Sequence, residues 1–202
     1  DADLELASSL AFASRLAANA GQTCNAAKRF IVHKDIIEEF SNKLIKHFET
    51  IIVGDPKDEK TTMGPLSSEQ TLNDVRRQVE ASTKAGAKVL FVGKVPDLSG
   101  YFFPPMILGG VKKGMASYDE EVFGPVASII SFSTEDEAID LANDTEYGLG
   151  ATIVTNDTDK AKKLAPRIMA GSVFVNAQVR SDPRTPFGGI KRSGYGRELS
   201  SY

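Results

Sequence analysis

The sequence has no tryptophan, a single cysteine and only two histidines, His33 and His47. A lone cysteine cannot close an internal disulfide, which excludes the small extracellular domains that depend on disulfide frameworks. One cysteine and two histidines are also a poor ligand supply for a structural zinc, so we expect no metal site. Because a free thiol suits a reducing compartment, we expect a cytoplasmic protein.

Signals for membranes and for nucleic acids are lacking as well. No apolar run approaches the roughly 20 residues that span a bilayer. The acidic start, Asp1-Ala2-Asp3-Leu4-Glu5, does not resemble a secretory signal. The formal net charge of -3 gives no general attraction to nucleic acid or to an anionic membrane surface. We therefore expect neither of them as a partner.

What is present is an alternation of helix and strand patterns over 202 residues, a length that suits one α/β domain. Residues 93–114 are rich in glycine and proline and are predicted to be an irregular connection. Strands separated by helices favour a three-layer α/β fold, in which a mostly parallel open sheet carries helices on both faces. Apolar runs predict strands at residues 29–32, 88–92, 126–132, 151–154 and 172–175.

Several helix ends are predicted from capping residues. Asp35, Thr134 and Asp157 are each placed to cap the start of a helix. Thr134 also has Glu137 at the spacing of a capping box. Gly86 suits the left-handed position that follows the end of a helix.

The cysteine, Cys24, lies in a loop between the first predicted helix, residues 4–18, and the first predicted strand. A catalytic thiol needs exposure, a fixed position and surroundings that favour the thiolate. Gly21 lets the backbone turn tightly and leaves room for a substrate. Backbone N–H groups near Cys24, with a side-chain amide such as Asn19 or Gln22, are candidates to support a developing oxyanion. From these residues alone, a small buried hydrophobe is an equally good interpretation of Cys24.

Longer strings of residues decide between these interpretations. The string Asn19-x-Gly21-Gln22-x-Cys24 resembles the cysteine signature of the NAD(P)-dependent aldehyde dehydrogenase superfamily. The resemblance covers nearly the whole chain, which favours Cys24 as a nucleophile and implies the fold of that family's catalytic domain. Further blocks occur in the family's order: Asp1-Ala2-Asp3-Leu4, 28–32, Gly54-Asp55-Pro56, Gly64-Pro65-Leu66, 120–125, Ala142-Asn143-Asp144, Tyr147-Gly148-Leu149, 186–189 and 191–198.

The resemblance implies a mechanism of aldehyde oxidation. The Cys24 thiolate attacks the aldehyde to give a thiohemiacetal, hydride passes to the nicotinamide of NAD or NADP, and water hydrolyses the thioester that remains. The oxyanion is held by the backbone N–H of the cysteine and by an asparagine of an upstream domain. Glu121 corresponds to the glutamate that binds the nicotinamide ribose, and Phe123 to the aromatic residue beside the ring. Without the motif, Glu121 would be read as a surface acid and Phe123 as a core residue.

Two further residues correspond to positions near the active site in the family. Glu198 matches a glutamate that is sometimes linked to proton relay, and an ion pair with Arg197 or Lys191 is an equal alternative. Phe187 lies in the segment that closes the substrate tunnel, so we expect it to touch substrate. The alternative for Phe187 is plain packing against the glycines that follow it.

The substrate loop, residues 176–184, is similar in layout to that of succinate-semialdehyde dehydrogenases. In that branch of the family a serine helps to hold the distal carboxylate of the substrate, and Ser181 falls at this position. Arg180 and Arg184 would add favourable charge for an anionic substrate, or they are solvated loop arginines. The resemblance thus implies succinate semialdehyde or a similar small aldehyde as substrate.

One position departs from that branch. Its well-known members place an arginine directly before the asparagine of the cysteine motif, where this chain has Ala18. Arg15 lies one helical turn earlier, on a neighbouring face of the predicted helix. The departure puts the carboxylate clamp in doubt.

The resemblance also assigns parts of the active enzyme to other segments. It places the general base, a glutamate, together with the dinucleotide-binding domain before the start of this sequence, and a last oligomerisation strand after its end. We therefore expect residues 1–202 to form a single catalytic domain that is inactive alone. The intact enzyme is expected to be a homo-dimer or homo-tetramer.

Two other classes of protein are considered. An acyl-transferring or thioester-hydrolysing enzyme would need a base beside Cys24, and only His33 and His47 are available. We interpret the first as a strand-end residue and the second as a surface residue of a helix. A non-catalytic α/β interaction module is the other alternative, and fast alkylation of Cys24 that is slowed by cofactor would distinguish the dehydrogenase from it.

Overall fold

A computed structural model describes residues 1–17 and 19–201 of the chain. Its largest sheet has four strands in the order β1-β4-β3-β2. Strands β1 (Arg29–His33), β4 (Val126–Phe132) and β3 (Met106–Gly109) run parallel to one another. Strand β2 (Lys88–Val92) pairs with β3 in the antiparallel direction and forms one edge.

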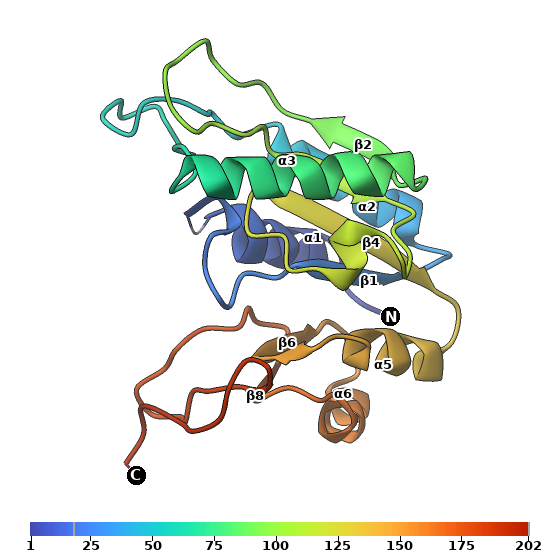
Figure 1. Cartoon of the computed structure of the whole chain (residues 1–202). Helices are drawn as coiled ribbons and strands as arrows, with labels where there is room; N and C mark the ends of the chain where they lie inside the picture. Colours follow the sequence, from blue (N-terminus) through green and yellow to red (C-terminus); the bar gives the residue numbers. More distant parts are fainter. Residues whose placement is uncertain (18, 202) are drawn as a thin grey trace.

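Four shorter strands form two separate pairs. Strand β6 (Gly150–Ile153) pairs with β7 (Ser172–Val175) in the parallel direction. Strand β5 (Tyr147–Gly148) pairs with β8 (Ile190–Lys191) in the antiparallel direction. Figure 1 shows these strands on the β1 side of the four-stranded sheet. The expected mostly parallel pairing is confirmed, but it is distributed over more than one sheet.

Helices cover both faces of the four-stranded sheet. Helix α3 (Glu69–Lys84) lies in front of β4, whereas α1 (Leu4–Phe12) and α2 (Ile37–Phe48) lie behind it (Figure 1). The other α-helices are α4 (Ala116–Asp119), α5 (Glu135–Asn143) and α6 (Thr158–Leu164). Apolar side chains of the central strands and of the covering helices fill the core, among them Leu44, Phe48, Val75, Ile107, Leu108, Val126 and Ile129.

The five predicted strands are confirmed, whereas β3 falls within the stretch predicted to be irregular. Its four residues stand between proline-rich and glycine-rich segments, so a short apolar run carried no periodic signal there. Burial on both faces identifies it: all four of its residues are buried. No helix of the described residues is long and apolar enough to cross a membrane.

The first helix and one cap differ from the prediction. The α-helix α1 ends at Phe12, and a π-helical turn, Ala13–Ala17, follows it. Asp35 does not cap α2, whose N-cap is Ile36 with no side-chain cap hydrogen bond. The Asp35 backbone N–H donates to His33 instead, with 3.3 Å between the two nitrogens.

The remaining caps agree with the sequence. The Thr134 hydroxyl accepts from the backbone N–H of Glu137, and the Asp157 carboxylate accepts from that of Lys160. Gly86 adopts a φ of 105° after α3, a left-handed conformation that glycine takes without steric cost.

Gly171 is predicted to be indispensable for the packing of the smaller strands. A Cβ atom at this position would overlap the carbonyl oxygen of Gly188, a backbone atom that cannot move aside alone. We expect Gly171→Ala to lower the free energy of unfolding by more than about 2 kcal/mol, measured by thermal denaturation of the native-length protein. Gly64→Ala is the control, since its added Cβ would meet only a proline ring carbon at 3.2 Å. Equal stability of the two variants would contradict the prediction.

Candidate active site

The thiol of Cys24 is exposed in a turn between the π-helical segment and β1. The loop reaches this turn through a short helical stretch, Asn19–Gly21, whose first two residues have positive φ angles of 57° and 55°. A Cβ atom on Gly21 would overlap the carbonyl oxygen of Gly124. Glycine is therefore required here, because the cysteine loop lies directly against the backbone of the segment after Phe123.

The amide of Gln22 holds the loop in shape. Its Nε2 donates to the carbonyl of Asn19 at 3.0 Å, and its Oε1 accepts from the backbone N–H of Ser67 at 2.8 Å. These bonds commit the Gln22 side chain to structure, although it was a candidate for oxyanion support. Within the described part of the chain, the backbone N–H of Cys24 has no acceptor. That N–H is the donor beside the thiol that remains available to an oxyanion.

Lys28 joins the cysteine loop to Glu121. Its Nζ donates to the carbonyls of Cys24 and Ala26, each at 3.0 Å, and to that of Thr23 at 3.3 Å. The same Nζ lies 3.1 Å from Oε1 of Glu121. Burial lowers the pKa of Lys28, and the Glu121 carboxylate opposes this shift. Sequence reasoning assigned no role to Lys28, although it opens the 28–32 block that carried the family resemblance.

Phe123 lies beside the same lysine. The ammonium nitrogen of Lys28 is 5.7 Å from the centroid of the Phe123 ring, a cation–π distance. Phe123 is half-buried and is not a core residue. Lys28 thus brings together Cys24, Glu121 and Phe123, three residues selected from the sequence.

The three acidic residues of the run 119–121 have different partners. Glu120 accepts hydrogen bonds from Arg77 and Gln78, which hold the pKa of its carboxyl below the ordinary value. Asp119 accepts from the backbone N–H of Gly114. Among the described residues, Glu121 is the acid of this run that pairs with Lys28, which bonds to the cysteine loop. Glu121 is therefore more than a surface acid.

Arg15 is fully buried and also ties the loop to this segment. Its guanidinium donates to the carbonyl of Val122 at 2.6 Å, to that of Gly124, and to that of Ala27 at 3.3 Å. Burial lowers the pKa of Arg15 to about 9, and the charge of Glu121 opposes the shift. Arg15 is therefore not available to clamp a substrate carboxylate. Ala18, the position of the arginine in the related branch, lies outside the described residues.

The substrate loop is attached next to the cysteine. The Asn25 side chain donates to the carbonyl of Val179 at 3.1 Å, two residues before Ser181. Arg184 binds the Asp182 carboxylate through two nitrogens, at 2.9 and 2.6 Å, which lowers the pKa of Asp182. The charge of Arg184 is thereby neutralised. Arg180 is exposed and has no carboxylate partner among the described residues.

Phe187 and Glu198 lie opposite each other. Their backbones exchange two hydrogen bonds, at 2.8 and 2.9 Å, in an isolated antiparallel bridge. Arg197 donates to the carbonyl of Gly189, and Lys191 donates to backbone carbonyls at the end of α5 and after it. Within residues 19–201 neither cation pairs with Glu198, whose side chain is exposed. The relay role of Glu198 and the substrate contact of Phe187 stay predictions.

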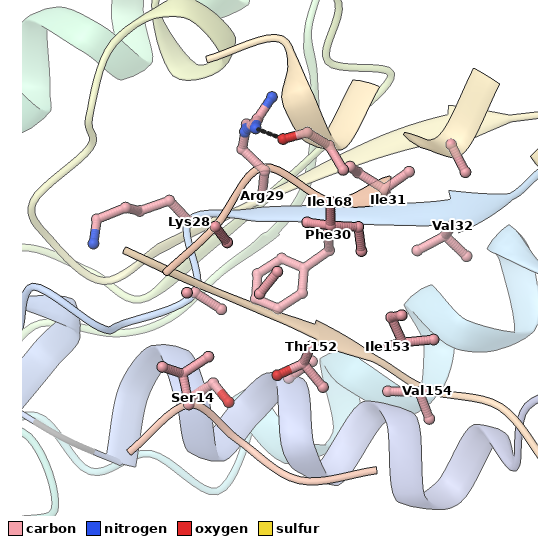
Figure 2. A pocket seen from close by; sticks show the side chains of 18 of the residues that line it. Ser14, Lys28, Arg29, Phe30, Ile31, Val32, Thr152, Ile153, Val154 and Ile168 are labelled. Atoms are coloured by element: carbon pink, nitrogen blue, oxygen red, sulfur yellow. Dashed lines mark hydrogen bonds between the residues drawn. The ribbon is translucent and has the colours of Figure 1, made fainter. Parts of the chain in front are cut away.

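A cavity of about 830 Å³ includes Cys24, Lys28 and Glu121 in its lining. Figure 2 shows part of its lining, where residues of β1 and of β6 lie across from each other. Arg29 fixes one wall, because its guanidinium donates to three backbone carbonyls at the end of α5. Cys24 and Glu121 thus line one space that is large enough for a small ligand.

The comparison with known proteins agrees with this geometry. The sequence matches the Aldehyde dehydrogenase family over residues 1–202. The chain belongs to this family. It is 47% identical over 201 residues to the NADP(+) succinate-semialdehyde dehydrogenase 1 of Mycobacterium tuberculosis, an alignment that covers 100% of this chain and 44% of that relative.

Solved structures of the family confirm the α/β fold class. Succinic semialdehyde dehydrogenase from Streptococcus pyogenes, in complex with NADP+, matches with a TM-score of 0.93 at 44% identity, over 99% of this chain and 44% of the other. Betaine aldehyde dehydrogenase from Staphylococcus aureus, in complex with NAD+, matches with a TM-score of 0.92 at 37% identity, over 99% and 40%. The chain spans less than half the length of these relatives.

Neither histidine is bonded to the thiol. His33 lies at the end of β1 and its Nε2 is 3.2 Å from the carbonyl oxygen of Ser133. His47 of α2 stacks on Phe12, with 5.5 Å between the ring centroids. Both histidines are occupied within the packing of the fold, which leaves a cysteine–histidine dyad without support.

We predict that Arg15 stabilises the site as a buried donor. Arg15→Met removes the Arg15 donors of the Val122, Gly124 and Ala27 carbonyls, of which Gly124 keeps the backbone N–H of Val126. We therefore expect the free energy of unfolding to fall by about 3 kcal/mol. Denaturant unfolding of the native-length protein measures the change. Arg76→Met is the control, because the Arg76 bond to Asn73 is exposed, and its loss should cost less than about 0.5 kcal/mol. A loss in the Arg15 variant no larger than in the control would refute the assignment.

Proposed function

We propose that this chain supplies the cysteine site of an enzyme that oxidises an aldehyde to a carboxylic acid with NAD(P)+. One observation carries the proposal: the exposed thiol of Cys24 stands in a loop that Lys28 ties to Glu121 and Phe123. Membership of the aldehyde dehydrogenase family and the dehydrogenase names of its relatives support it.

In the proposed reaction Cys24 acts as the nucleophile. Its thiolate adds to the aldehyde carbon, and the carbonyl oxygen becomes an oxyanion that the free backbone N–H of Cys24 can bind. NAD(P)+, when bound, accepts the hydrogen and two electrons that leave the aldehyde carbon. Cys24 then carries the acyl group as a thioester, and water releases the acid and restores the thiol.

The residues present fit a nicotinamide ribose. Lys28 engages Oε1 of Glu121, and the Glu121 side chain keeps 32% of its surface exposed. Its second oxygen, Oε2, has no hydrogen-bond donor among the described residues, so it can accept from a ribose hydroxyl. The half-buried ring of Phe123 has its centroid 5.7 Å from Nζ of the same lysine and would limit where a flat ring can lie.

For the substrate we propose succinate semialdehyde or a similar small aldehyde. The names of the relatives from M. tuberculosis and S. pyogenes support this choice. Ser181 and Arg180 lie in the loop that Asn25 attaches beside the cysteine, and both are exposed. A hydroxyl and an unpaired guanidinium are suitable donors for a distal carboxylate.

The larger context is part of the same proposal. We propose that residues 1–202 act as a single catalytic domain, and that the general base and the dinucleotide-binding fold come from other segments. A homo-dimer or homo-tetramer is the expected assembly. A reducing compartment such as the cytoplasm would preserve the exposed thiol of Cys24.

Removal of the thiol tests the reaction directly. In the native-length protein we expect Cys24→Ser to lower kcat by at least about 10³-fold, because a serine hydroxyl has no comparable anionic form at neutral pH. Formation of NAD(P)H measures turnover, and mass spectrometry after iodoacetamide treatment confirms that alkylation is lost. Circular dichroism should match the unaltered protein. Turnover at a similar rate in the variant would exclude Cys24 as the nucleophile.

Charge selectivity tests the substrate. We expect kcat/KM for succinate semialdehyde to exceed that for butanal, an uncharged aldehyde of the same carbon chain length. Arg180→Ala should reduce this preference by about fivefold to tenfold. Arg184→Ala should change it little, because Arg184 already binds Asp182. No preference for the charged aldehyde in the unaltered protein would rule the substrate out.

A further inference from the structure

We propose that Lys28 is a positioning residue that couples the state of the Cys24 loop to the cofactor carboxylate, Glu121. The inference rests on the proposed function and deepens it, since it assigns the coupling of nucleophile and cofactor to one side chain. Its basis is that Lys28 contacts two groups that are distant from each other in sequence. Cys24 lies 4 residues before Lys28, and Glu121 lies about 90 residues after it.

The ammonium group of Lys28 has more partners than protons. It carries three N–H donors. Four oxygens lie within reach: the carbonyls of Thr23, Cys24 and Ala26, and Oε1 of Glu121, at distances of 3.0 to 3.3 Å. The four acceptors therefore compete for three protons. A change in the strength of the Lys28–Glu121 contact must therefore alter the strength of the hydrogen bonds from Lys28 to the carbonyls around Cys24.

Cofactor binding changes how strongly Glu121 attracts the ammonium group of Lys28. A ribose hydroxyl that donates to this carboxylate shares its negative charge and weakens the pull on Lys28. The ammonium can then turn fully to the three loop carbonyls. The loop that carries the thiol is thereby held most firmly when the dinucleotide is in place, which is the state in which the nucleophile is needed.

A purely structural role would leave these electrostatic effects out. Gln22 and Arg15 already hold the loop through buried hydrogen bonds to Ser67 and Val122. Lys28 is distinct because its bonds end on a carboxylate that faces the cavity. The two roles therefore predict different results for the reactivity of Cys24.

The test measures the rate at which iodoacetamide alkylates Cys24 with and without saturating NAD(P)+, in the native-length protein. We expect added dinucleotide to change this rate at least about threefold in the unaltered protein and less than about 1.5-fold in Lys28→Met. Lys28→Arg should keep most of the effect because it keeps the charge. Lys43→Met is the matched control. Lys43 of α2 also lies 3.1 Å from a glutamate carboxylate, that of Glu5 on α1, but among the described residues this pair makes no hydrogen bond to the cysteine loop.

Cofactor dependence is measured in the same variants. We expect Lys28→Met to lower KM for NADP+ or NAD+ about threefold, with a smaller change in kcat, because the ribose no longer competes with the ammonium group for Glu121. It should also abolish the effect of added dinucleotide on the alkylation rate. In a Glu121→Gln background, Lys28→Met should add little to the change in KM, since the two residues act through one contact.

The results separate this inference from the proposed function. A dinucleotide effect on alkylation in Lys28→Met that equals the effect in the unaltered protein overturns the inference, whether or not the protein turns over aldehydes. Lowered thermal stability with an unchanged dinucleotide effect also overturns it, because Lys28 would then be only a structural contact. If the unaltered protein forms no NAD(P)H from any aldehyde, the proposed function fails, and a dinucleotide effect that depends on Lys28 would still support the coupling.

Discussion

The site depends on two cations that hold separate stretches of backbone together. Arg15 and Lys28 donate to carbonyls of the cysteine loop on one side and engage the segment of Glu121 on the other. A buried cation is costly unless its hydrogen-bond acceptors are all in place. The carbonyls around Arg15 and Lys28 are therefore not interchangeable, and the position of the thiol follows from the positions of its neighbours across the fold.

Close backbone contact complements these ionic contacts. Gly21 lies against Gly124, where any side chain would overlap the carbonyl oxygen. A side chain at Gly21 would also lie close to the Arg15 guanidinium, which donates to the same carbonyl. The exposed thiol thus stands on a rigid base, which satisfies the two demands on a nucleophile, accessibility and fixed position.

How much of this the sequence predicted depended on the range of each interaction. Thr134, Asp157 and Gly86 act on neighbouring residues, so local rules placed them correctly. Asp35 satisfied the same rule and still failed, because the chain turns at His33 before α2 begins. Strand β3 was missed because its apolar run lies within residues 93–114, whose many glycines and prolines predict an irregular connection.

The site itself was predicted through resemblance rather than through local patterns. Cys24 was an open question on its own loop, and Glu121 looked like one of three adjacent acids. Lys28 contacts both the Cys24 carbonyl and the Glu121 carboxylate. Arg15 bonds to Gly124, which is 109 positions away in sequence. Sequence periodicity does not predict such long-range pairs, so the roles of these two cations could be identified only from the fold.

The substrate loop shows why charge counted from sequence can mislead. Two arginines flank Ser181 closely, and the sequence left open whether they add charge for an anionic substrate or are solvated loop residues. In the fold, Arg184 makes a two-nitrogen contact with Asp182, and this pair presents little net charge to a ligand. If the proposed substrate is correct, Arg180 and the Ser181 hydroxyl are the groups of this loop left to bind its carboxylate, because Arg15 is committed to backbone carbonyls inside the protein. A selectivity built on one exposed guanidinium is modest and sensitive to salt, since solvent screens an exposed charge more than a buried one.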